Sequence, residues 1–251
     1  MAHELTIVPD KEALAREGAR RVRASVVAAV RARCRCTLVL SGGRTPRGLY
    51  EALAEPPSFA VDATPWDRVE LFFGDERHVP PDHPDSNYRM VQDALASRVA
   101  IPATQVHRVR TEQPDATEAA AAYALELARA FALAPGEWPR FDVVLLGMGS
   151  DGHTASLFPH TRVLDEREHL AAAVWVTALQ SSRITLTYPV LNNAREVYVL
   201  VSGVEKAETL RAVLEAPADP ERFPIQGIQP RQGTLTWIVD EAAASRLSGT
   251  L

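Results

Sequence analysis

The stretch FDVVLLGMGSDGHTASLFP, residues Phe141–Pro159, decides how the rest of the chain is interpreted. Phe141–Leu146 is a short run of aliphatic and β-branched residues, which predicts a strand buried on both faces of a parallel sheet. A glycine turn ends this strand, and two titratable residues, Asp151 and His153, follow at once. Open α/β folds bind their ligands at the carboxyl ends of such strands, and glycine lets a ligand approach the backbone closely. We therefore predict a functional site at this turn.

The glycines of this turn also match G-x-G-x-x-G, the fingerprint of dinucleotide-binding loops, but the match alone is weak. A nicotinamide site also needs an acidic residue about 20 positions further on, at the end of the next strand. Asp165, Glu166 and Glu168 lie near that distance, but they precede the next apolar run, Ala171–Val176. An aspartate and a histidine also occupy a loop in which the fingerprint favours small residues. The sequence therefore favours another use of this turn.

Composition restricts the class of protein. The chain has 251 residues, of which 46% are hydrophobic and 24% charged, and this fits one globular domain over residues 1–251. The net charge of −5 argues against nucleic-acid binding. No signal peptide and no apolar run of membrane-spanning length is visible, so we expect a cytoplasmic protein that does not bind a membrane. Cys34 and Cys36 are too few for a zinc site or a disulfide framework and are expected to be reduced thiols.

Strand and helix patterns alternate along the whole chain. Besides the strand of the opening motif, apolar runs predict strands at Leu5–Val8, Thr37–Ser41, Val69–Phe73, Ala173–Thr177, Ile184–Leu186, Val197–Val201 and Leu235–Val239. Helices are expected from Asp10 to about Ala32, from Thr45 to Leu53, over Asn87–Val99 and Asp115–Leu133, after Ser202 or Gly203, and over Glu241–Leu247. This order, without a linker, predicts an α/β fold with one doubly wound, mainly parallel sheet and helices on both faces.

Two of the turns after strands carry a basic residue beside a helix start. In SGGRTP, Thr45 is predicted as the N-cap and Pro46 as the first helical residue. A glycine turn before a helix offers free N–H groups and the positive end of the helix dipole to an anion, and Arg44 adds a full charge. Lys206, in SGVEKAETL, lies in a first helical turn, where a cation is unfavourable without an anion. The alternative to an anion site is a tight turn with an exposed arginine at Arg44 and an ordinary surface lysine at Lys206.

A third turn, GDERHVPPDHPDSNY, follows Val69–Phe73 and brings Asp75 and Arg77 to the end of a strand. Its histidines and aspartates could ligate a metal, but prolines make the loop irregular and the ligand spacing matches no recognised site, so we expect no metal. These residues are His78, Asp82, His83 and Asp85. Basic groups, carboxylates and one histidine at a shared sheet edge favour acid/base chemistry on a sugar phosphate over acyl-enzyme chemistry, because no G-x-S-x-G elbow is present.

Five segments together resemble one known family. They are SGGRTPRGLYEAL, FFGDERHVPPDHPDSNY, GMGSDGHTASLFP, RITLTYPVLNNA and SGVEKAETL, and they cover most of the chain from Ser41 onward. In these segments the chain is similar to the 6-phosphogluconolactonases. The resemblance implies the glucosamine-6-phosphate isomerase-like fold, no cofactor, and hydrolysis of 6-phospho-D-glucono-1,5-lactone to 6-phosphogluconate in the oxidative pentose phosphate pathway. The expected partner is this small lactone, and the expected state is a monomer or weak homo-oligomer.

The resemblance also implies roles for individual residues. His153 would be the general base that activates water, and Arg77 would lie in the substrate pocket. For the mechanism we expect Asp151 or a backbone carbonyl to hold the imidazole, Arg77 or backbone N–H groups to stabilise the oxyanion, and Asp75 to bind sugar hydroxyls. The other substrate-binding residues, at the glycine turns and around the phosphate, would be Gly42, Gly43, Arg44, Thr45, Gly149, Arg183 and Lys206.

Amino-sugar-phosphate deaminases and isomerases are the nearest alternative. They look similar around the glycine turn, but a Phe-Asn-Glu-Pro run usually follows it, and its glutamate assists ring opening. Here Ser156–Pro159 contains no acid, and Arg44 stands where those enzymes usually have a small hydroxyl residue. A non-catalytic sugar-phosphate sensor would need a DNA-binding module, for which the chain has no room. Ile225 departs from the family pattern, where a smaller residue is expected, and leaves the last loop open.

Overall fold

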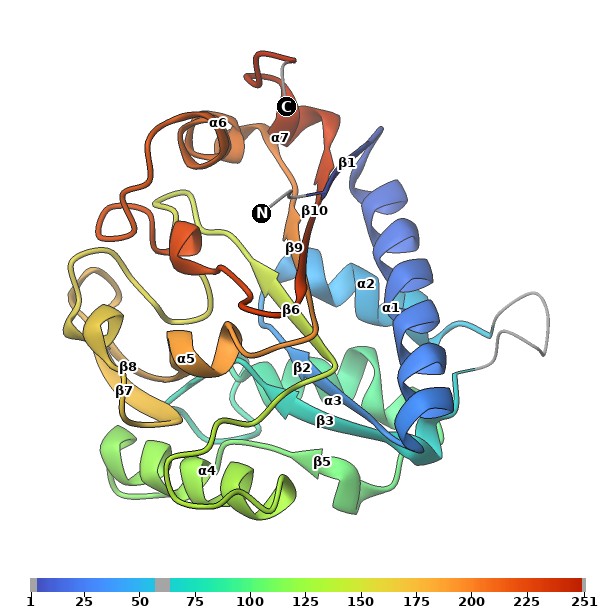
Figure 1. The fold of residues 1–251 in the computed structure, drawn as a ribbon, viewed down its shortest axis with the longest axis vertical. Coiled ribbons are helices and arrows are strands. Elements are labelled where there is room, and N and C mark those ends of the chain that lie inside the picture. The colour runs from blue at the N-terminus through green and yellow to red at the C-terminus, as the bar shows by residue number, and fades with distance from the viewer. Residues whose placement is uncertain (1–3, 57–63, 250–251) are drawn as a thin grey trace.

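A seven-stranded parallel sheet forms the centre of the computed structural model, which describes residues 4–56 and 64–249 (Figure 1). Its strand order is β1-β10-β9-β6-β2-β3-β5. β6, the strand of the opening motif, therefore lies in the middle, paired in parallel with β2 and β9. The predicted doubly wound parallel sheet is confirmed. The strands are β1 (Glu4–Val8), β2 (Cys36–Leu40), β3 (Val69–Phe73), β5 (Val106–His107), β6 (Val143–Gly147), β9 (Glu196–Val201) and β10 (Thr234–Asp240).

Helices cover both faces of this sheet. Figure 1 shows α1 and α2 on one side, and α5 with a smaller sheet on the other. The α-helices of the described residues are α1 (Lys11–Arg33), α2 (Arg44–Ala54), α3 (Asn87–Ala94), α4 (Ala116–Ala130), α5 (Tyr188–Leu191), α6 (Ala207–Glu215) and α7 (Glu241–Ala244). Several end earlier than expected. The helix predicted to reach Val99, for example, stops at Ala94 and continues as a separate 3-10 turn, Ala96–Arg98.

The long first helix shows why the sequence predicts these elements well. Asp10 caps α1 by accepting a hydrogen bond from the Ala13 N–H at 2.7 Å. Residues at fourfold spacing, among them Leu14, Gly18 and Val22, form its buried stripe. A Cβ on Gly18 would lie 2.5 Å from Leu49 Cδ1, so glycine at this position lets α1 approach α2 closely.

A second, three-stranded antiparallel sheet was not anticipated by the sequence analysis. It has the order β4-β8-β7 and comprises β4 (Asp75–Arg77), β7 (Ala171–Val176) and β8 (Ser181–Leu186). β7 and β8 were expected as strands, but they form a hairpin through the 3-10 turn Thr177–Leu179 instead of joining the main sheet. An apolar run predicts a strand and does not specify its partner, so this pairing is decided by tertiary packing.

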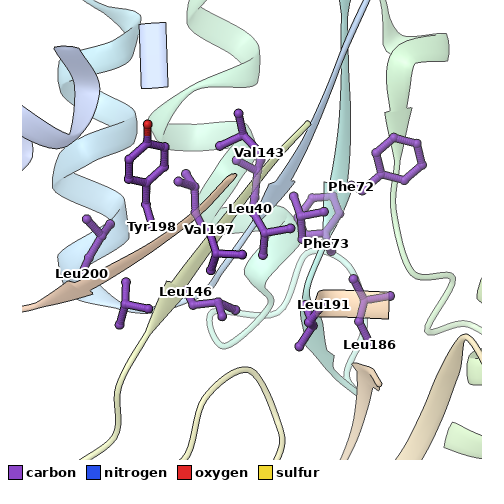
Figure 2. Close-up of a cluster of buried hydrophobic side chains, with 14 of the residues drawn as sticks. Leu40, Phe72, Phe73, Val143, Leu146, Leu186, Leu191, Val197, Tyr198 and Leu200 are labelled. Carbon is purple, nitrogen blue, oxygen red and sulfur yellow. The ribbon is translucent and has the colours of Figure 1, made fainter. Parts of the chain in front are cut away.

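Apolar side chains fix the small sheet to the large one. Figure 2 shows Leu40 and Leu146 from the main sheet in one cluster with Leu186 of β8 and Leu191 of α5. All four side chains are fully buried. Because the core is continuous across the two sheets, the loops that leave β2, β4, β6 and β8 have fixed relative positions.

Two buried tyrosines fix the ends of neighbouring strands. The Tyr50 hydroxyl of α2 accepts the Ser41 N–H and donates to the Ser41 carbonyl, both at 2.8 Å. The Tyr123 hydroxyl of α4 accepts the Phe73 N–H at 2.8 Å and donates to the Phe73 carbonyl at 3.0 Å. Each hydroxyl thus satisfies a backbone donor and acceptor where a strand turns into a loop, groups that would be costly to bury unpaired.

The edge strand β5 carries a histidine between two carboxylates. The His107 ring stacks on Phe72 with centroids 4.4 Å apart. Its Nδ1 lies 2.7 Å from Glu126 Oε1, and its Nε2 lies 3.5 Å from Glu70 Oε2. The contact with Glu70, helped by that with Glu126 and opposed by burial, raises the pKa of His107.

Candidate active site

A cavity of about 320 Å³ opens at the carboxyl edge of the main sheet, within the size range of small-molecule sites. It is bounded by the loops after β2, β6 and β9 and by strands β4 and β8. The predicted site residues that line it are Gly42, Gly43, Arg44, Thr45, Asp75, Arg77, Gly149, His153, Arg183 and Lys206. Asp151 does not line the cavity and instead contacts His153.

The glycine turn after β6 is closely packed. The Gly149 N–H donates to the His153 carbonyl at 2.8 Å. A Cβ on Gly149 would lie 2.1 Å from His153 Nδ1, so only glycine leaves room for the ring. Gly152 has φ +79°, and a Cβ there would lie 3.1 Å from Phe223 Cα. Gly149 and Gly152 therefore allow the chain to turn sharply around the His153 ring. In the described chain this turn leads into a loop rather than a helix. A dinucleotide site needs a helix N-terminus at this point to bind the pyrophosphate, so the turn does not form such a site.

His153 is held from two sides. Its Nδ1 lies 2.5 Å from Asp151 Oδ1, and the same oxygen accepts the His153 backbone N–H at 3.1 Å. The ring stacks on Phe158 with centroids 4.2 Å apart. An ionised carboxylate only accepts hydrogen bonds, so Nδ1 carries the proton and Nε2 is the basic nitrogen of the neutral ring. Of the two groups considered from the sequence, Asp151 is the one in contact with the imidazole.

Asp151 stays ionised in this pair. Burial by itself raises the pKa of the Asp151 carboxyl, but the hydrogen bonds and the charge of His153 outweigh burial and lower this pKa overall. A carboxylate at Nδ1 favours the imidazolium that forms when Nε2 takes a proton. The arrangement therefore suits general base catalysis.

Asp75 is buried in a network that sequence reasoning missed. Its Oδ2 accepts the Ser156 hydroxyl at 2.7 Å, and its Oδ1 accepts the Asn87 amide at 3.2 Å. A Cβ on Gly42 would lie 2.0 Å from Asn87 Oδ1, so the Asn87 side chain packs directly against the glycine turn after β2. Ser156 had one available signal, its place three residues after His153. Asn87 lies at the start of α3 and gave none.

Arg77 and Arg183 face each other in register across β4 and β8. Like charges directly opposite destabilise a strand pair, and an anion would relieve the repulsion. Burial, and next the charge of Arg77, lower the pKa of Arg183. Over residues 4–56 and 64–249, neither buried Nε atom has a hydrogen-bond partner, although Arg77 also donates to the Asp85 carbonyl at 2.6 Å. These two guanidiniums form a cationic wall of the cavity.

The turn between β2 and α2 corrects one prediction. Helix α2 begins at Arg44, and Gly43, not Thr45, is its N-cap, with φ +105°. A positive φ favours glycine at the cap, and Pro46 is tolerated because first-turn N–H groups have no intrahelical acceptor. Within the described residues no side chain caps this helix end, and its first residues line the cavity. Arg44 and Thr45 still line the cavity.

Lys206 reaches the cavity from the loop after β9. Gly203, with φ +104°, caps the 3-10 turn Val204–Lys206, and α6 follows directly. Opening of this helical segment at Gly203 agrees with the sequence prediction. Glu205 lines the cavity next to Lys206 and was not anticipated. In the described part of the chain, neither Arg44 nor Lys206 forms an ion pair with a carboxylate.

The last loop closes over the back of the glycine turn. Ile225 is buried, and its N–H donates to the Gly152 carbonyl at 3.0 Å. The large residue therefore fits the core instead of disturbing the site.

Neither a metal cluster nor a membrane span is found in residues 4–56 and 64–249. No group of three His, Cys, Asp or Glu side chains there could hold a metal ion. His78 Nε2 lies 3.1 Å from the Gln113 carbonyl, and His83 pairs with Asp85 at 3.8 Å. No helix in these ranges is long and apolar enough to cross a membrane.

The fold and the cavity define an α/β protein with a cavity that Arg44, Arg77, Arg183 and Lys206 line beside a histidine–carboxylate pair. The family model for glucosamine-6-phosphate isomerases/6-phosphogluconolactonase matches residues 9–237. The chain therefore belongs to this family. It is 42% identical over 248 residues to the 6-phosphogluconolactonase of Nostoc sp., covering 99% of this chain and 100% of that protein. The human 6-phosphogluconolactonase is 42% identical over 223 residues, which cover 86% of this chain and 83% of the human protein.

Solved structures show the same fold. The 6-phosphogluconolactonase from Thermotoga maritima matches with a TM-score of 0.80 and 30% identity, covering 95% of this chain and 100% of that one. A monomeric glucosamine-6-phosphate deaminase matches with a TM-score of 0.80 at 19% identity, covering 97% of this chain and 99% of that one. At this identity the match shows a likeness of fold alone. Because both activities occur on this fold, the fold does not choose between them, and the choice depends on the site.

Proposed function

We propose that this chain hydrolyses 6-phospho-D-glucono-1,5-lactone to 6-phosphogluconate, a step of the oxidative pentose phosphate pathway. The observation that carries the proposal is the His153–Asp151 pair at a cavity that also holds four cationic side chains. Relatives named 6-phosphogluconolactonase, 42% identical over nearly the whole chain in the first case, support the same substrate. The cations are Arg44, Arg77, Arg183 and Lys206.

His153 acts as the general base in this reaction. Its Nε2 takes a proton from water, and the resulting hydroxide oxygen attacks the lactone carbonyl carbon. Asp151 keeps the ring in the productive tautomer and offsets the charge of the imidazolium. The tetrahedral intermediate then breaks its bond to the ring oxygen, which takes the proton held by His153 Nε2 and leaves as the sugar hydroxyl, so the neutral imidazole is restored. No acyl-enzyme and no metal is needed.

The cationic side chains divide between the phosphate of the substrate and the carbonyl oxygen that becomes negative in the tetrahedral intermediate. We assign the phosphate to Arg44, Lys206 and Arg183, because a helix start favours a dianion and because the buried Nε of the half-buried Arg183 has no hydrogen-bond partner within residues 4–56 and 64–249. Arg77 is assigned to the developing oxyanion. The buried carboxylate of Asp75 is assigned to sugar hydroxyls, since a carboxylate accepts their hydrogen bonds.

A deaminase or isomerase function is less well supported by the same site. Those enzymes usually carry a glutamate after the histidine turn to assist ring opening. In this chain the residues that line the cavity just after His153 are Ala155, Ser156 and Phe158, and none is an acid. A proton relay for opening an amino sugar therefore lacks its expected carboxylate.

The test is hydrolysis of the lactone by purified protein at constant pH, corrected for spontaneous ring opening. We expect His153→Ala to lower kcat by at least about 10²-fold, the low end for loss of a general base. His160→Ala is the control, because this exposed histidine, seven residues on, does not line the cavity. Activity should survive dialysis against a chelator. A His153 variant within threefold of wild type, or turnover of glucosamine-6-phosphate instead, would contradict the proposal.

A cytoplasmic location, a monomer or weak homo-oligomer and the lack of nucleic-acid binding stay predictions. The expectation about nucleic acid rests on the net charge of −5. Size measurement in solution at several protein concentrations would decide the oligomeric state.

A further inference from the structure

Asp240 is a buried carboxylate that contacts the loop after β9 without lining the cavity. It is the last residue of β10, which lies beside β9 (Figure 1), and it is only 4% exposed. Its Oδ2 accepts the Ser202 hydroxyl at 2.5 Å. Both of its oxygens lie 3.1 Å from the Gly203 backbone nitrogen, which donates to them. Asp240 therefore binds the first two residues that follow β9.

Those two residues set the direction in which the chain leaves the sheet. Gly203 has φ +104°, and its carbonyl accepts the Lys206 N–H at 3.0 Å to close the turn. Ser202 lines the cavity, but its hydroxyl proton is directed to Asp240, so towards the cavity it presents only lone pairs. Lone pairs do not bind a phosphate dianion. Ser202 thus holds the turn, and Lys206 supplies the positive charge.

The bonding of Asp240 exceeds what helix capping needs. Its Oδ1 also accepts the Ala243 N–H at 2.8 Å, which caps α7. One side-chain oxygen is enough for a cap, and Asn or Ser serves as well as Asp. Here a buried carboxylate forms no ion pair within the described residues and is satisfied by three separate donors. Two of those donors belong to the turn that carries Lys206.

We propose that Asp240 is a positioning residue for phosphate recognition: it fixes the Ser202–Gly203 turn and thereby places Lys206. This inference rests on the proposed lactonase function for its substrate. Asp240 itself lies on β10, not on β9 or the loop that carries Lys206, and its side chain does not line the cavity.

The test uses Asp240→Asn, which keeps the size of the side chain and an oxygen for the α7 cap. The amide nitrogen replaces one acceptor, so the Ser202 hydroxyl and the Gly203 N–H can no longer both be bound as before. The readout is the ratio of kcat/KM for the phosphorylated lactone to that for unphosphorylated glucono-1,5-lactone. We expect this ratio to fall roughly tenfold, mainly through KM, the size of losing one charge-assisted hydrogen bond. Ser202→Ala should lower it in the same direction.

Asp115→Asn is the matched control. Asp115 caps α4 by accepting the N–H groups of Thr117 and Glu118, and it does not line the cavity. Its variant should leave the ratio within threefold of wild type. Equal losses on both lactones in Asp240→Asn and an unchanged ratio in Ser202→Ala would overturn the inference, because Asp240 would then serve the fold alone.

A second readout separates this inference from the proposed function. Binding of inorganic phosphate, measured by calorimetry, should weaken roughly tenfold in Asp240→Asn and less in Ser202→Ala. If wild type binds phosphate but hydrolyses no lactone, the proposed function fails, and the phosphate affinities alone decide the role of Asp240. Unchanged phosphate affinity in both variants would refute it. Ser202→Ala keeps the α7 cap, so it gives an answer even if Asp240→Asn is too unstable to purify.

Discussion

The contact between Asp151 and His153 allows a quantitative prediction. Replacing Asp151 by Ala removes the acceptor of the ring Nδ1–H at 2.5 Å and the acceptor of the His153 backbone N–H at 3.1 Å. The ring then loses both its fixed tautomer and the charge that stabilises the imidazolium. Asp151→Asn keeps an oxygen that can accept both bonds but removes the charge, so its effect should be intermediate.

The exposure of the pair sets the magnitude. The Asp151 side chain is 48% exposed and that of His153 is 31% exposed, so water screens the interaction. A hydrogen bond to a charged group contributes about 1.5–3 kcal/mol, and the lower end applies to this half-exposed pair. About 1.5 kcal/mol corresponds to roughly tenfold in rate. We expect Asp151→Ala to lower kcat about 10- to 30-fold, with KM for the lactone little changed.

The chain contains a matched control for this experiment. Glu166 accepts both the backbone N–H and, at 3.1 Å, the ring Nδ1 of His169, but this pair does not line the cavity. Glu166→Ala therefore removes two bonds of the same kind elsewhere, together with the bond from the Glu168 N–H at 2.6 Å, and should leave kcat unchanged. Steady-state hydrolysis and thermal melting are measured on all variants. An Asp151→Ala enzyme within threefold of wild type, or one that loses no more than Glu166→Ala, would refute the reasoning.

Three further outcomes are expected. Arg44→Ala and Lys206→Ala should each lose roughly 10- to 150-fold in kcat/KM for the phosphorylated lactone and little for gluconolactone, whereas equal losses on both would place the phosphate elsewhere. Tyr50→Phe and Tyr123→Phe should each lower the free energy of unfolding by about 1–3 kcal/mol in urea titration, because two strand-end backbone groups lose their partner; a change below about 0.5 kcal/mol contradicts this. The raised pKa of His107 means that its two carboxylate contacts stabilise the folded state below the unfolded pKa of about 6.5, and that this contribution is lost as pH rises through the higher folded value. The difference in free energy of unfolding between wild type and His107→Gln should therefore be larger at about pH 5.5 than at about pH 8.5. A difference that grows with pH would contradict the raised pKa of His107.

Much of the candidate site could be predicted because its residues follow strands whose apolar runs are unambiguous. The end of β6 identifies Asp151 and His153 directly, since a buried strand and a glycine turn leave few conformations for the residues between them. The helix starts that carry Arg44 and Lys206 were visible for a similar reason, although the cap of α2 was misplaced at Thr45. A positive φ at Gly43 cannot be read from the letters GGRTP, where two glycines compete for the position.

What could not be predicted depends on contacts between segments far apart in the chain. Arg183 lies opposite Arg77 only because β8 pairs antiparallel with β4 in a second sheet. Asp75 meets Ser156, 81 residues away, and neither segment contains a pattern that specifies the other. The role of Asp240 is of the same kind, because its partners in the loop after β9 lie 37 and 38 residues earlier.

The sequence by itself determined most strands and helices, the family and the turns that carry the chemistry, because period, glycine position and helix caps are local properties of the chain. It did not predict the short elements β4, β5 and α5. Only the tertiary structure decided which turns share the cavity wall, which carboxylate contacts the histidine, and which buried groups hold the loops in place. Those outcomes depend on strand order and side-chain packing, in which each contact is selected by the shape of the whole core rather than by its neighbours in sequence.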